Sequence, residues 1–503
     1  MSINRRELLR SLGGLCAWAT LPELGACAEP DARAPAFGFW HHVASGDPLP
    51  DAVILWTRVT PRLSGDSYDV TWQVSADAAF REVVATGIST TDATRDFTVK
   101  VDADGLESGT AYYYRFQVED ITSPTGRTQT APTADVSRLR FAVASCSSLA
   151  HGYFHGYRAI SELSDLDAVI HLGDYIYEHA NNVYGSVRAY EPAHELFTLS
   201  DYRQRYAQYR RDQDLQALHA RWPLIAVWDD HEFANDAYLE GAQNHNPELG
   251  EGSWAERKAA ALQAYAEWMP IREPAPGRVF RSFRFGELLD LIMLDTRSWG
   301  RQRQASGAGD AVLQDPERTL LGHDQEAWLG EQLQASRARW RVLGQQVMLG
   351  HFALGGNFDV WEGYPAARAR LLAQLRAAPG DSVVLTGDVH SSWAMNVIDE
   401  PFNPAAYDPA TGQGSYAVEF ITPGITSPLL AKPDAEAWQP IALQQPHVKY
   451  AQLWRRGYML IDVTAERVQA DWYHFDAVDR PEPVSPTHAA TAAAYYGERC
   501  VRL

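Results

Sequence analysis

The segment from His171 to Glu178 follows a short apolar run with two oxygen donors that could bind metal ions. The run, Ala168 to Ile170, has the composition of a buried strand, and Asp174 and Tyr177 come after it, three residues apart. A carboxylate can bridge two cations, whereas a phenolate favours a strongly Lewis-acidic ion such as ferric iron. Ligand sites of α/β sheets lie at the carboxyl ends of strands. The spacing therefore indicates a two-metal site, although Asp-x-x-Tyr alone also fits a packed tyrosine beside a helix-capping aspartate.

Four other apolar runs also end in side chains that can bind metals. Phe141 to Ala144 precedes Ser145-Cys146, Leu224 to Trp228 precedes Asp229-Asp230-His231-Glu232, Gln346 to Gly350 precedes His351, and Ser382 to Gly387 precedes Asp388 and His390. Ligands that come from separate rigid strands fix a coordination geometry. We therefore predict that the runs are strands and that their ends converge on one site.

At these segments the chain resembles the PhoD-like alkaline phosphatase and phosphodiesterase family, a branch of the calcineurin-like metallophosphoesterases. The matching blocks occur in the family's order and span nearly the whole mature chain. They are His42 to Pro48, Leu55 to Arg58, Ser145 to Ser147, Gly173 to Glu178, Trp228 to Glu232, Leu294 to Arg297, Leu321 to Leu329 and Gly387 to His390. The resemblance implies a layered α-β-β-α metallophosphoesterase domain that hydrolyses phosphoric esters.

The resemblance also implies which residues hold the metals. The ligands of a ferric ion (Fe3+) would be Cys146, Tyr177 and His390, with Asp174 bridging to a second metal. The residues that face this second metal, which is calcium (Ca2+) in some members, would be Asp230, Asn235 and Asp388. Thiolate, phenolate and imidazole suit a transition metal, whereas carboxylates and an amide suit a hard divalent cation. His231 would lie beside the metals as a catalytic residue, without binding them.

Several neighbouring residues have more than one interpretation. Asn235 and Asp236 compete for one role, because the motif varies after Asp-Asp-His. His351 stands where related metallophosphoesterases have a metal-binding histidine, but it could also bind a loop carbonyl. His171, inside an apolar strand, is expected to be a hydrogen-bonded core histidine. Asp229 and Asp230 could merely cap a following helix, and only one of the two need bind metal.

The expected reaction is direct displacement at phosphorus. A hydroxide held between the metals would attack in line, while the cations neutralise charge on the phosphoryl oxygens. The same metals serve monoesters and diesters, so the alternative is a phosphodiesterase or phospholipase-like activity. A second alternative is an exported protein that binds metal or phosphate without turnover, which would not need His231.

The first 28 residues are expected to be an export signal. Arg5-Arg6 is a twin arginine, and Leu12 to Ala26 is an apolar run too short and weak to span a membrane permanently. The twin-arginine translocation machinery carries folded proteins, which suits an enzyme that loads its metals first. Residues 24 to 27 also fit a lipoprotein cleavage box that would place a lipid anchor on Cys27; the alternative is cleavage after Ala28. The expected location is periplasmic or extracellular.

Composition agrees with an exported enzyme of small anionic substrates. The chain has 64 acidic and 44 basic side chains, a net charge of −20, so a tightly held nucleic acid is not expected. Cys16 and Cys27 lie in or at the edge of the signal, which leaves Cys146 and Cys500 in the folded part. Two cysteines make no disulfide framework.

The pattern of apolar residues divides the chain into two domains. Residues 37 to 130 are expected to form a small all-β sandwich of the immunoglobulin or fibronectin type, with strands at 52 to 56, 70 to 74 and 112 to 119. A linker is expected at 122 to 137, and the catalytic domain at 138 to 490. The predicted helices of this α/β domain include 202 to 220, 254 to 268 and 324 to 339. Loops around the site mouth are expected at 399 to 414 and 433 to 450.

Overall fold

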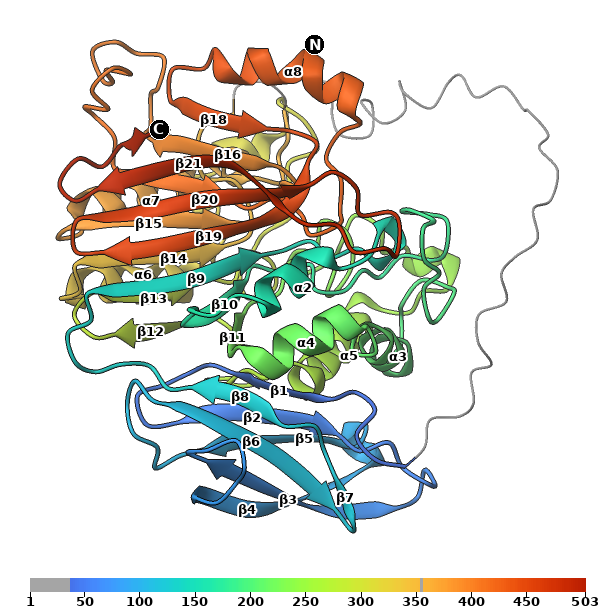
Figure 1. The fold of residues 1–503 in the computed structure, drawn as a ribbon. Coiled ribbons are helices and arrows are strands. Elements are labelled where there is room, and N and C mark those ends of the chain that lie inside the picture. Colours follow the sequence, from blue (N-terminus) through green and yellow to red (C-terminus); the bar gives the residue numbers. More distant parts are fainter. Residues whose placement is uncertain (1–36, 353–355) are drawn as a thin grey trace.

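The computed structural model describes residues 37–352 and 356–503. The predicted export signal, with Cys16, Cys27 and the cleavage box at 24 to 27, lies outside these residues. Within them the chain forms three β-sheets and seven α-helices, which is an α/β architecture (Figure 1). In the described part of the chain, no helix is long and apolar enough to cross a membrane.

The largest sheet has ten strands and extends through most of the height of the molecule in Figure 1, from β21 down to β2 and β5. Its strands, in spatial order, are β22 (Val501–Arg502), β21 (Thr487–Tyr495), β20 (Arg467–Phe475), β19 (Arg456–Thr464), β9 (Arg138–Ala144), β10 (Ala168–His171), β11 (Leu224–Ala226), β1 (Val43–Gly46), β2 (Val53–Arg58) and β5 (Thr98–Ala103). β9, β10, β11 and β1 are parallel. β10 and β11 are buried along their whole length, as expected for parallel strands covered on both faces.

A second sheet has seven strands and carries the other half of the catalytic region. Its strands, in spatial order, are β12 (Arg281–Phe285), β13 (Leu289–Met293), β14 (Trp340–Gln345), β15 (Asp381–Thr386), β17 (Ala417–Ile421), β16 (Ser392–Val397) and β18 (Val448–Gln452). β13, β14, β15 and β17 are parallel. Their carboxyl ends therefore meet at one edge of the sheet.

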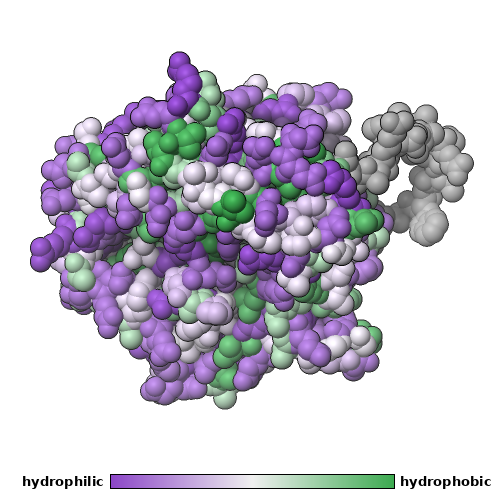
Figure 2. All heavy atoms as spheres, turned by 90° about the horizontal axis from the view of Figure 1, so that it is seen from below, coloured by the Kyte–Doolittle hydropathy of each residue, from purple (hydrophilic) through white to green (hydrophobic). Residues whose placement is uncertain are grey.

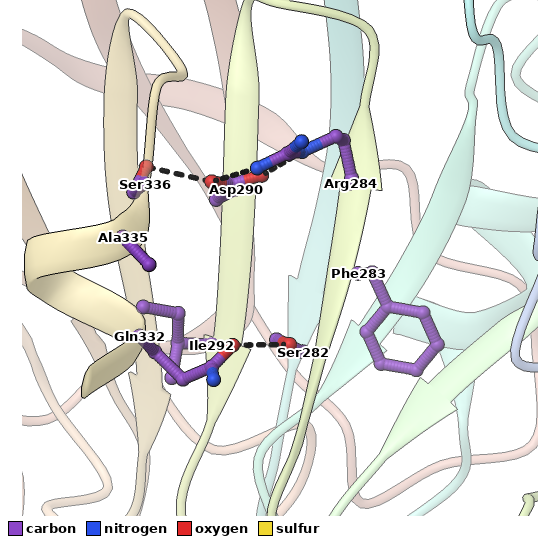
Figure 3. Close-up of a pocket in the computed structure, with 8 residues that line it drawn as sticks. All are labelled: Ser282, Phe283, Arg284, Asp290, Ile292, Gln332, Ala335 and Ser336. Atoms are coloured by element: carbon purple, nitrogen blue, oxygen red, sulfur yellow. Dashed lines mark hydrogen bonds and ion pairs between the residues drawn. The ribbon is translucent and has the colours of Figure 1, made fainter. Parts of the chain in front are cut away.

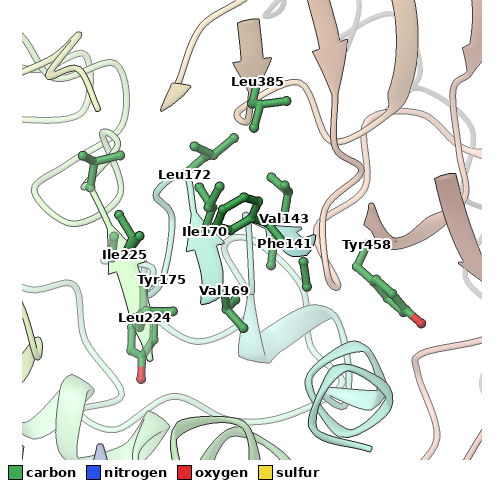
Figure 4. Close-up of a cluster of buried hydrophobic side chains, with 14 of the residues drawn as sticks. Phe141, Val143, Val169, Ile170, Leu172, Tyr175, Leu224, Ile225, Leu385 and Tyr458 are labelled. Atoms are coloured by element: carbon green, nitrogen blue, oxygen red, sulfur yellow. The ribbon is translucent and has the colours of Figure 1, made fainter. Parts of the chain in front are cut away.

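The two sheets share a hydrophobic core. Phe141 and Val143 of β9 and Ile170 of β10 belong to the same buried cluster as Leu385 of β15 (Figure 4). Side chains on the opposite face of the seven-stranded sheet pack in a separate cluster with α6 (His323–Ala335) and α7 (Pro365–Ala377). The other helices of the first half are α2 (His155–Ser161), α3 (Leu199–Tyr209), α4 (Gln213–Arg221) and α5 (Trp254–Trp268).

The N-terminal strands are joined to the catalytic strands by hydrogen bonds. β3 (Ser67–Ser75), β4 (Val83–Asp92), β6 (Ala111–Val118), β7 (Ile121–Thr122) and β8 (Gly126–Gln129) form a third sheet, which packs on β1, β2 and β5 through one buried cluster. β1 in turn pairs in parallel with β11, at Gly46 and Leu224. A side chain at Gly46 would stand 2.1 Å from the Pro270 carbonyl oxygen, which explains the glycine at this junction. Figure 2 views the molecule from below and shows hydrophilic residues over most of this face, with only scattered hydrophobic ones.

Several predicted elements agree with the structure. The N-terminal strands predicted at 52 to 56, 70 to 74 and 112 to 119 correspond to β2, β3 and β6. The helix predicted at 254 to 268 is α5, and the one at 324 to 339 is α6, which ends four residues earlier. No helix or strand is assigned to residues 399–414, as predicted for this loop.

Other predictions of local structure were wrong. The helix predicted at 202 to 220 is two helices, because the Asp212 side chain accepts hydrogen bonds from the Asp214 and Leu215 amides and so caps α4. The loop predicted at 433 to 450 contains α8 (Lys432–Leu443) and the start of β18, since Pro433 lies in the first turn of a helix, where proline is tolerated. The linker predicted at 122 to 137 contains β8, which pairs with β6.

The run from Gln346 to Gly350 is not a strand. β14 ends at Gln345, and the amides of Leu349 and Gly350 donate instead to the buried Glu419 carboxylate, over 2.9 and 2.7 Å. His351 consequently follows an irregular segment.

Candidate metal centre

Loops at the carboxyl ends of three parallel strands bring the predicted ligands together. Cys146 follows β9, Asp174 follows β10, and Asp388 and His390 follow β15. All four residues have left-handed backbone, with φ between 54° and 59°. Such conformations of non-glycine residues persist only where the surrounding structure holds them, and they cluster at functional sites.

The first group of donors combines sulfur, oxygen and nitrogen. One ligand atom each of Cys146, Asp174 and His390 lies within 4.8 Å of the others, and all three residues are buried. The Tyr177 hydroxyl donates to Asp174 Oδ2 over 2.9 Å and lies 3.3 Å from His390 Nε2. The four residues predicted around the first metal therefore form one cluster.

The protonation of this cluster fits a strongly charged cation. Burial raises the pKa of the Cys146 thiol well above its ordinary range, and the charge of Asp174 raises it further. Burial and Asp174 raise the pKa of the Tyr177 phenol in the same way. Both groups therefore stay neutral unless a nearby positive charge stabilises their anions, which is what a coordinated metal ion supplies.

A second group of donors consists of carboxylates. Asp229, Asp230 and Asp388 place one oxygen each within 4.8 Å of the others, and Asp230 also approaches Asp174 and His231. Asp230 Oδ2 accepts a hydrogen bond from the Asp236 amide over 2.6 Å. Asp230 Oδ1 is buried, accepts no hydrogen bond from the described residues and lies 3.5 Å from the Arg297 guanidinium. A buried oxygen of this kind suits a hard divalent cation, and calcium is bound by oxygen donors.

Asn235 lies in the loop that follows Asp230. Its backbone amide donates to Glu178 Oε1 over 2.7 Å, and its side-chain amide donates to Gln243 over 2.8 Å. Asp236 contacts Asp230 through its backbone amide. The structure thus keeps both residues beside the carboxylate group, with Asn235 turned toward Gln243.

His231 is held between the two groups of donors. Its Nδ1 donates to Glu178 Oε2 over 2.7 Å, and its ring stacks on that of Tyr177 with centroids 4.2 Å apart. Burial lowers the pKa of His231, but the charges of Glu178, Asp174 and Asp230 outweigh burial and raise it well above the ordinary value. The imidazole is therefore a protonated group that can donate to a departing oxygen.

Two residues that the sequence interpretation did not assign fix the geometry of the loops. Glu232 accepts hydrogen bonds from the amides of Asp174, Tyr175 and Asp229, and so ties the loop after β10 to the loop after β11. Gly173 allows this close approach, because a side chain there would lie 2.4 Å from Asp229 Cβ. Glu178 was part of the motif but received no role; its pairing with His231 depends on tertiary structure.

Arg297 also received no role in the sequence interpretation, although it belongs to the Leu-Asp-Thr-Arg motif. Its guanidinium is completely buried and contacts Asp229 at 2.5 Å, Asp388 at 3.2 Å and Asp359 at 2.8 Å. Asp229 is therefore paired with Arg297 and caps no helix, since residues 227–237 contain none. The guanidinium holds these carboxylates at fixed positions. Burial nevertheless raises the pKa of Asp229 well above its ordinary value, although the charge of Arg297 lowers it.

The two remaining histidines lie outside the donor groups. His171 Nε2 is 2.8 Å from the Tyr157 hydroxyl in the core, as expected. His351 forms an ion pair with Glu362, and its carbonyl oxygen contacts His447 Nε2. Neither belongs to a group of metal-binding side chains in the described residues.

A surface hollow on β12, β13 and α6 is not a candidate site. Figure 3 shows its polar side chains turned toward one another. Arg284 and Ser336 both donate to Asp290, and Ser282 donates to Gln332. Its hydrogen-bonding groups are thus already paired.

Comparison with known proteins agrees with the chemistry of the metal centre. The family model of the PhoD-like phosphatases matches residues 141–472, and that of their N-terminal domain matches residues 26–132. Alkaline phosphatase D of Bacillus subtilis (strain 168) is 37% identical over an alignment that covers 97% of this chain and 87% of the relative. A solved structure of PhoD is similar with a TM-score of 0.84 and 35% identity, and the match covers 93% of each chain. The chain therefore belongs to the PhoD-like phosphatase family and is a phosphoric ester hydrolase of the alkaline phosphatase type.

Proposed function

We propose that this hydrolase is exported and works with a ferric ion and a calcium ion. The observation that carries the choice of metals is the separation of donor types. Cys146, Tyr177 and His390 supply sulfur, phenolic oxygen and imidazole on one side of Asp174. Asp230 and Asp388 supply only oxygen on the other side. Iron suits the first set and calcium the second.

In the proposed mechanism, bound cations supply Lewis acidity that activates a water molecule and neutralises charge on the phosphoryl group. Asp174 spans the two donor groups and sets their separation. His231 donates a proton to the leaving oxygen, and Glu178 holds its ring through Nδ1 so that Nε2 carries the transferable proton. Arg297 pairs with Asp229 and Asp388 and holds both side chains in place.

The proposed architecture is a layered α-β-β-α catalytic domain at 138–490, preceded by an immunoglobulin- or fibronectin-like β-sandwich at 37–130. Two observations support it. α6 and α7 pack on one face of the seven-stranded sheet, whose other face packs on the ten-stranded sheet. The N-terminal sheet packs face to face on β1, β2 and β5.

Export is proposed from the sequence of residues 1–28. Arg5-Arg6 would engage the twin-arginine translocation machinery, and Cys27 would carry a lipid anchor if cleavage precedes it. Fractionation of cells expressing the full chain tests this proposal. We expect Arg5→Lys together with Arg6→Lys to retain the protein inside the cell, and unchanged export would contradict it.

Substrate class is best tested with two chromogenic esters. Hydrolysis of p-nitrophenyl phosphate and of bis-p-nitrophenyl phosphate would be compared after metal removal and after return of iron, calcium or both. We expect full monoester hydrolysis only with both metals. A preference for the diester under all conditions would instead assign the chain to phosphodiesterase chemistry, and full activity with zinc alone would contradict the choice of metals.

A further inference from the structure

Arg210 is a buried cation that pairs with no carboxylate among the described residues. It follows the last residue of α3 and is 1% exposed. Its three guanidinium nitrogens are buried and meet no acceptor at ordinary hydrogen-bond distance in the described residues, and the neutral Tyr175 phenol is the polar group that interacts with them. Its guanidinium stacks over the Trp56 ring of β2 at 4.0 Å, which covers one face but accepts no N–H. A buried charge without a counter-charge destabilises the fold, so a compensating group is expected.

Acidic residues in this region of the fold pair with other arginines. Asp212 pairs with Arg188 at 2.9 Å, and Asp96 pairs with Arg58 at 2.8 Å. Glu191 pairs with Arg211. Each of these carboxylates forms an ion pair with another arginine, so none of them neutralises the charge of Arg210.

Two imidazoles next to Arg210 also present unpaired nitrogens. Nδ1 of His219 in α4 and Nδ1 of His42, just before β1, are buried and make no hydrogen bond to the described residues. Nε2 of His219 is 2.8 Å from the Tyr175 hydroxyl, and with the phenol donating, the imidazole proton lies on Nδ1. Burial and then the charge of Arg210 lower the pKa of both histidines, so both rings are neutral at pH 7, and Nδ1 of His219 can donate.

We propose that the Arg210 guanidinium and the Nδ1 atoms of His42 and His219 bind one small monovalent anion of the halide class. The site carries a single positive charge, because its guanidinium is charged and its two imidazoles are neutral. A monovalent anion would neutralise this charge. The site would lie between β1 and β2 on one side and α3 and α4 on the other. A hydrogen bond between His219 and Tyr175 would connect this site to the metal centre, because Tyr175 follows Asp174 in the chain.

Thermal unfolding in different sodium salts tests this site. Purified enzyme would be unfolded in sodium gluconate, whose anion is too bulky for a buried site, and in mixtures that replace gluconate by chloride or bromide at constant ionic strength. Because an anion bound only to the folded protein stabilises it by mass action, we expect the midpoint to rise by roughly 2 °C and to saturate. A midpoint that does not change with the anion would overturn the proposal.

Two variants locate the effect. Arg210→Gln removes the charge and should abolish the halide-dependent rise. Arg81→Gln removes an arginine whose side chain is 83% exposed and should keep the rise. A rise that persists in Arg210→Gln would place the anion elsewhere.

A second measurement does not depend on the folding of any variant. Crystals of the wild-type enzyme grown in bromide should show an anomalous peak beside the Arg210 guanidinium. An ordered water there without an anomalous signal would contradict the proposal.

Discussion

Glu178 and His231 form an ion pair in which neither side chain reaches solvent, with Oε2 2.7 Å from Nδ1 and side-chain exposures of 0% and 5%. Glu178 also accepts from the Asn235 amide, so one carboxylate orients the imidazole and holds the loop after Asp230. Burial opposes the charge of Glu178, but His179 and His231 hold its pKa well below the ordinary value. Glu178 is therefore ionised, and its negative charge favours the protonated form of His231.

Replacing His231 tests its role as a proton donor. His231→Ala should retain both metals and lose turnover by about two to four orders of magnitude, the usual contribution of a positioned acid. Elemental analysis and kcat would be measured together, with His194→Ala, at an exposed histidine, as control. Loss of metal in His231→Ala would make His231 a ligand instead.

Replacing Glu178 should change the pH profile. The charge of Glu178 raises the pKa of His231 against the effect of burial, so Glu178→Gln should lower that pKa. A group with a lower pKa loses its proton at lower pH, and the alkaline limb of kcat/KM should therefore move down by about one pH unit or more. If the alkaline limb of kcat/KM stays at the same pH in Glu178→Gln, a group other than His231 causes that limb.

Removal of the bridging carboxylate should affect both metals at once. Asp174→Asn is expected to lose most bound metal and nearly all turnover, while circular dichroism stays that of a folded protein. Asp167→Asn is the matched control, because Asp167 stands just before the other end of β10 and accepts from the Arg140 amide. Near-normal activity of Asp174→Asn would end the two-metal proposal.

The identity of the first metal can be read from colour. A thiolate or phenolate on ferric iron absorbs visible light, so the purified enzyme should be coloured. Tyr177→Phe should shift or bleach the band and weaken iron retention by about ten- to a hundredfold. Tyr157→Phe removes a buried hydroxyl next to His171 and should leave the band unchanged. An active, colourless and iron-free wild type would show that divalent ions fill both positions.

Stability toward acid should depend on His474. Its Nε2 lies 2.9 Å from the Ser392 hydroxyl and joins β20 to β16, and burial lowers the pKa of the imidazole from 6.5 to about 4. A depressed histidine pKa stabilises the fold above pH 6.5, and this contribution is lost as the pH falls from 6.5 through 4. The loss amounts to about 3 kcal/mol of unfolding free energy.

Denaturant unfolding at pH 7 and pH 4 measures this loss. The difference between the two pH values should be smaller in His474→Asn than in the wild type, and unchanged in His194→Asn. Equal differences in all three proteins would exclude His474 as the acid-sensitive group.

The clustering of predicted ligands could be anticipated because each lies within a few residues of its strand. Cys146 comes two residues after β9, and Asp174 three residues after β10. Parallel strands carry such residues to one edge. Local sequence therefore contained most of the information about these positions.

The partners of these residues could not be anticipated in the same way. Arg297 contacts Asp229 and Asp388, which are 68 and 91 positions away along the chain. The pairing of Gly46 with Leu224 is equally remote in sequence. Such contacts are selected by tertiary packing, which no short pattern encodes. The missed helix α8 has a different reason, since Pro433 and Pro440 suggested a loop although Pro433 occupies a permitted first-turn position.

The pairing of β1 with β11 has a consequence for the behaviour of the chain as it folds. Without β1, β2 and β5, the short apolar strand β11 would be the outermost strand of the catalytic sheet, with unpaired amides and carbonyls. Exposed edges of this kind recruit other chains and lead to aggregation. The N-terminal strands β1, β2 and β5 thus also cover the edge of the catalytic sheet at β11. In this position they keep that edge from pairing with other copies of the chain.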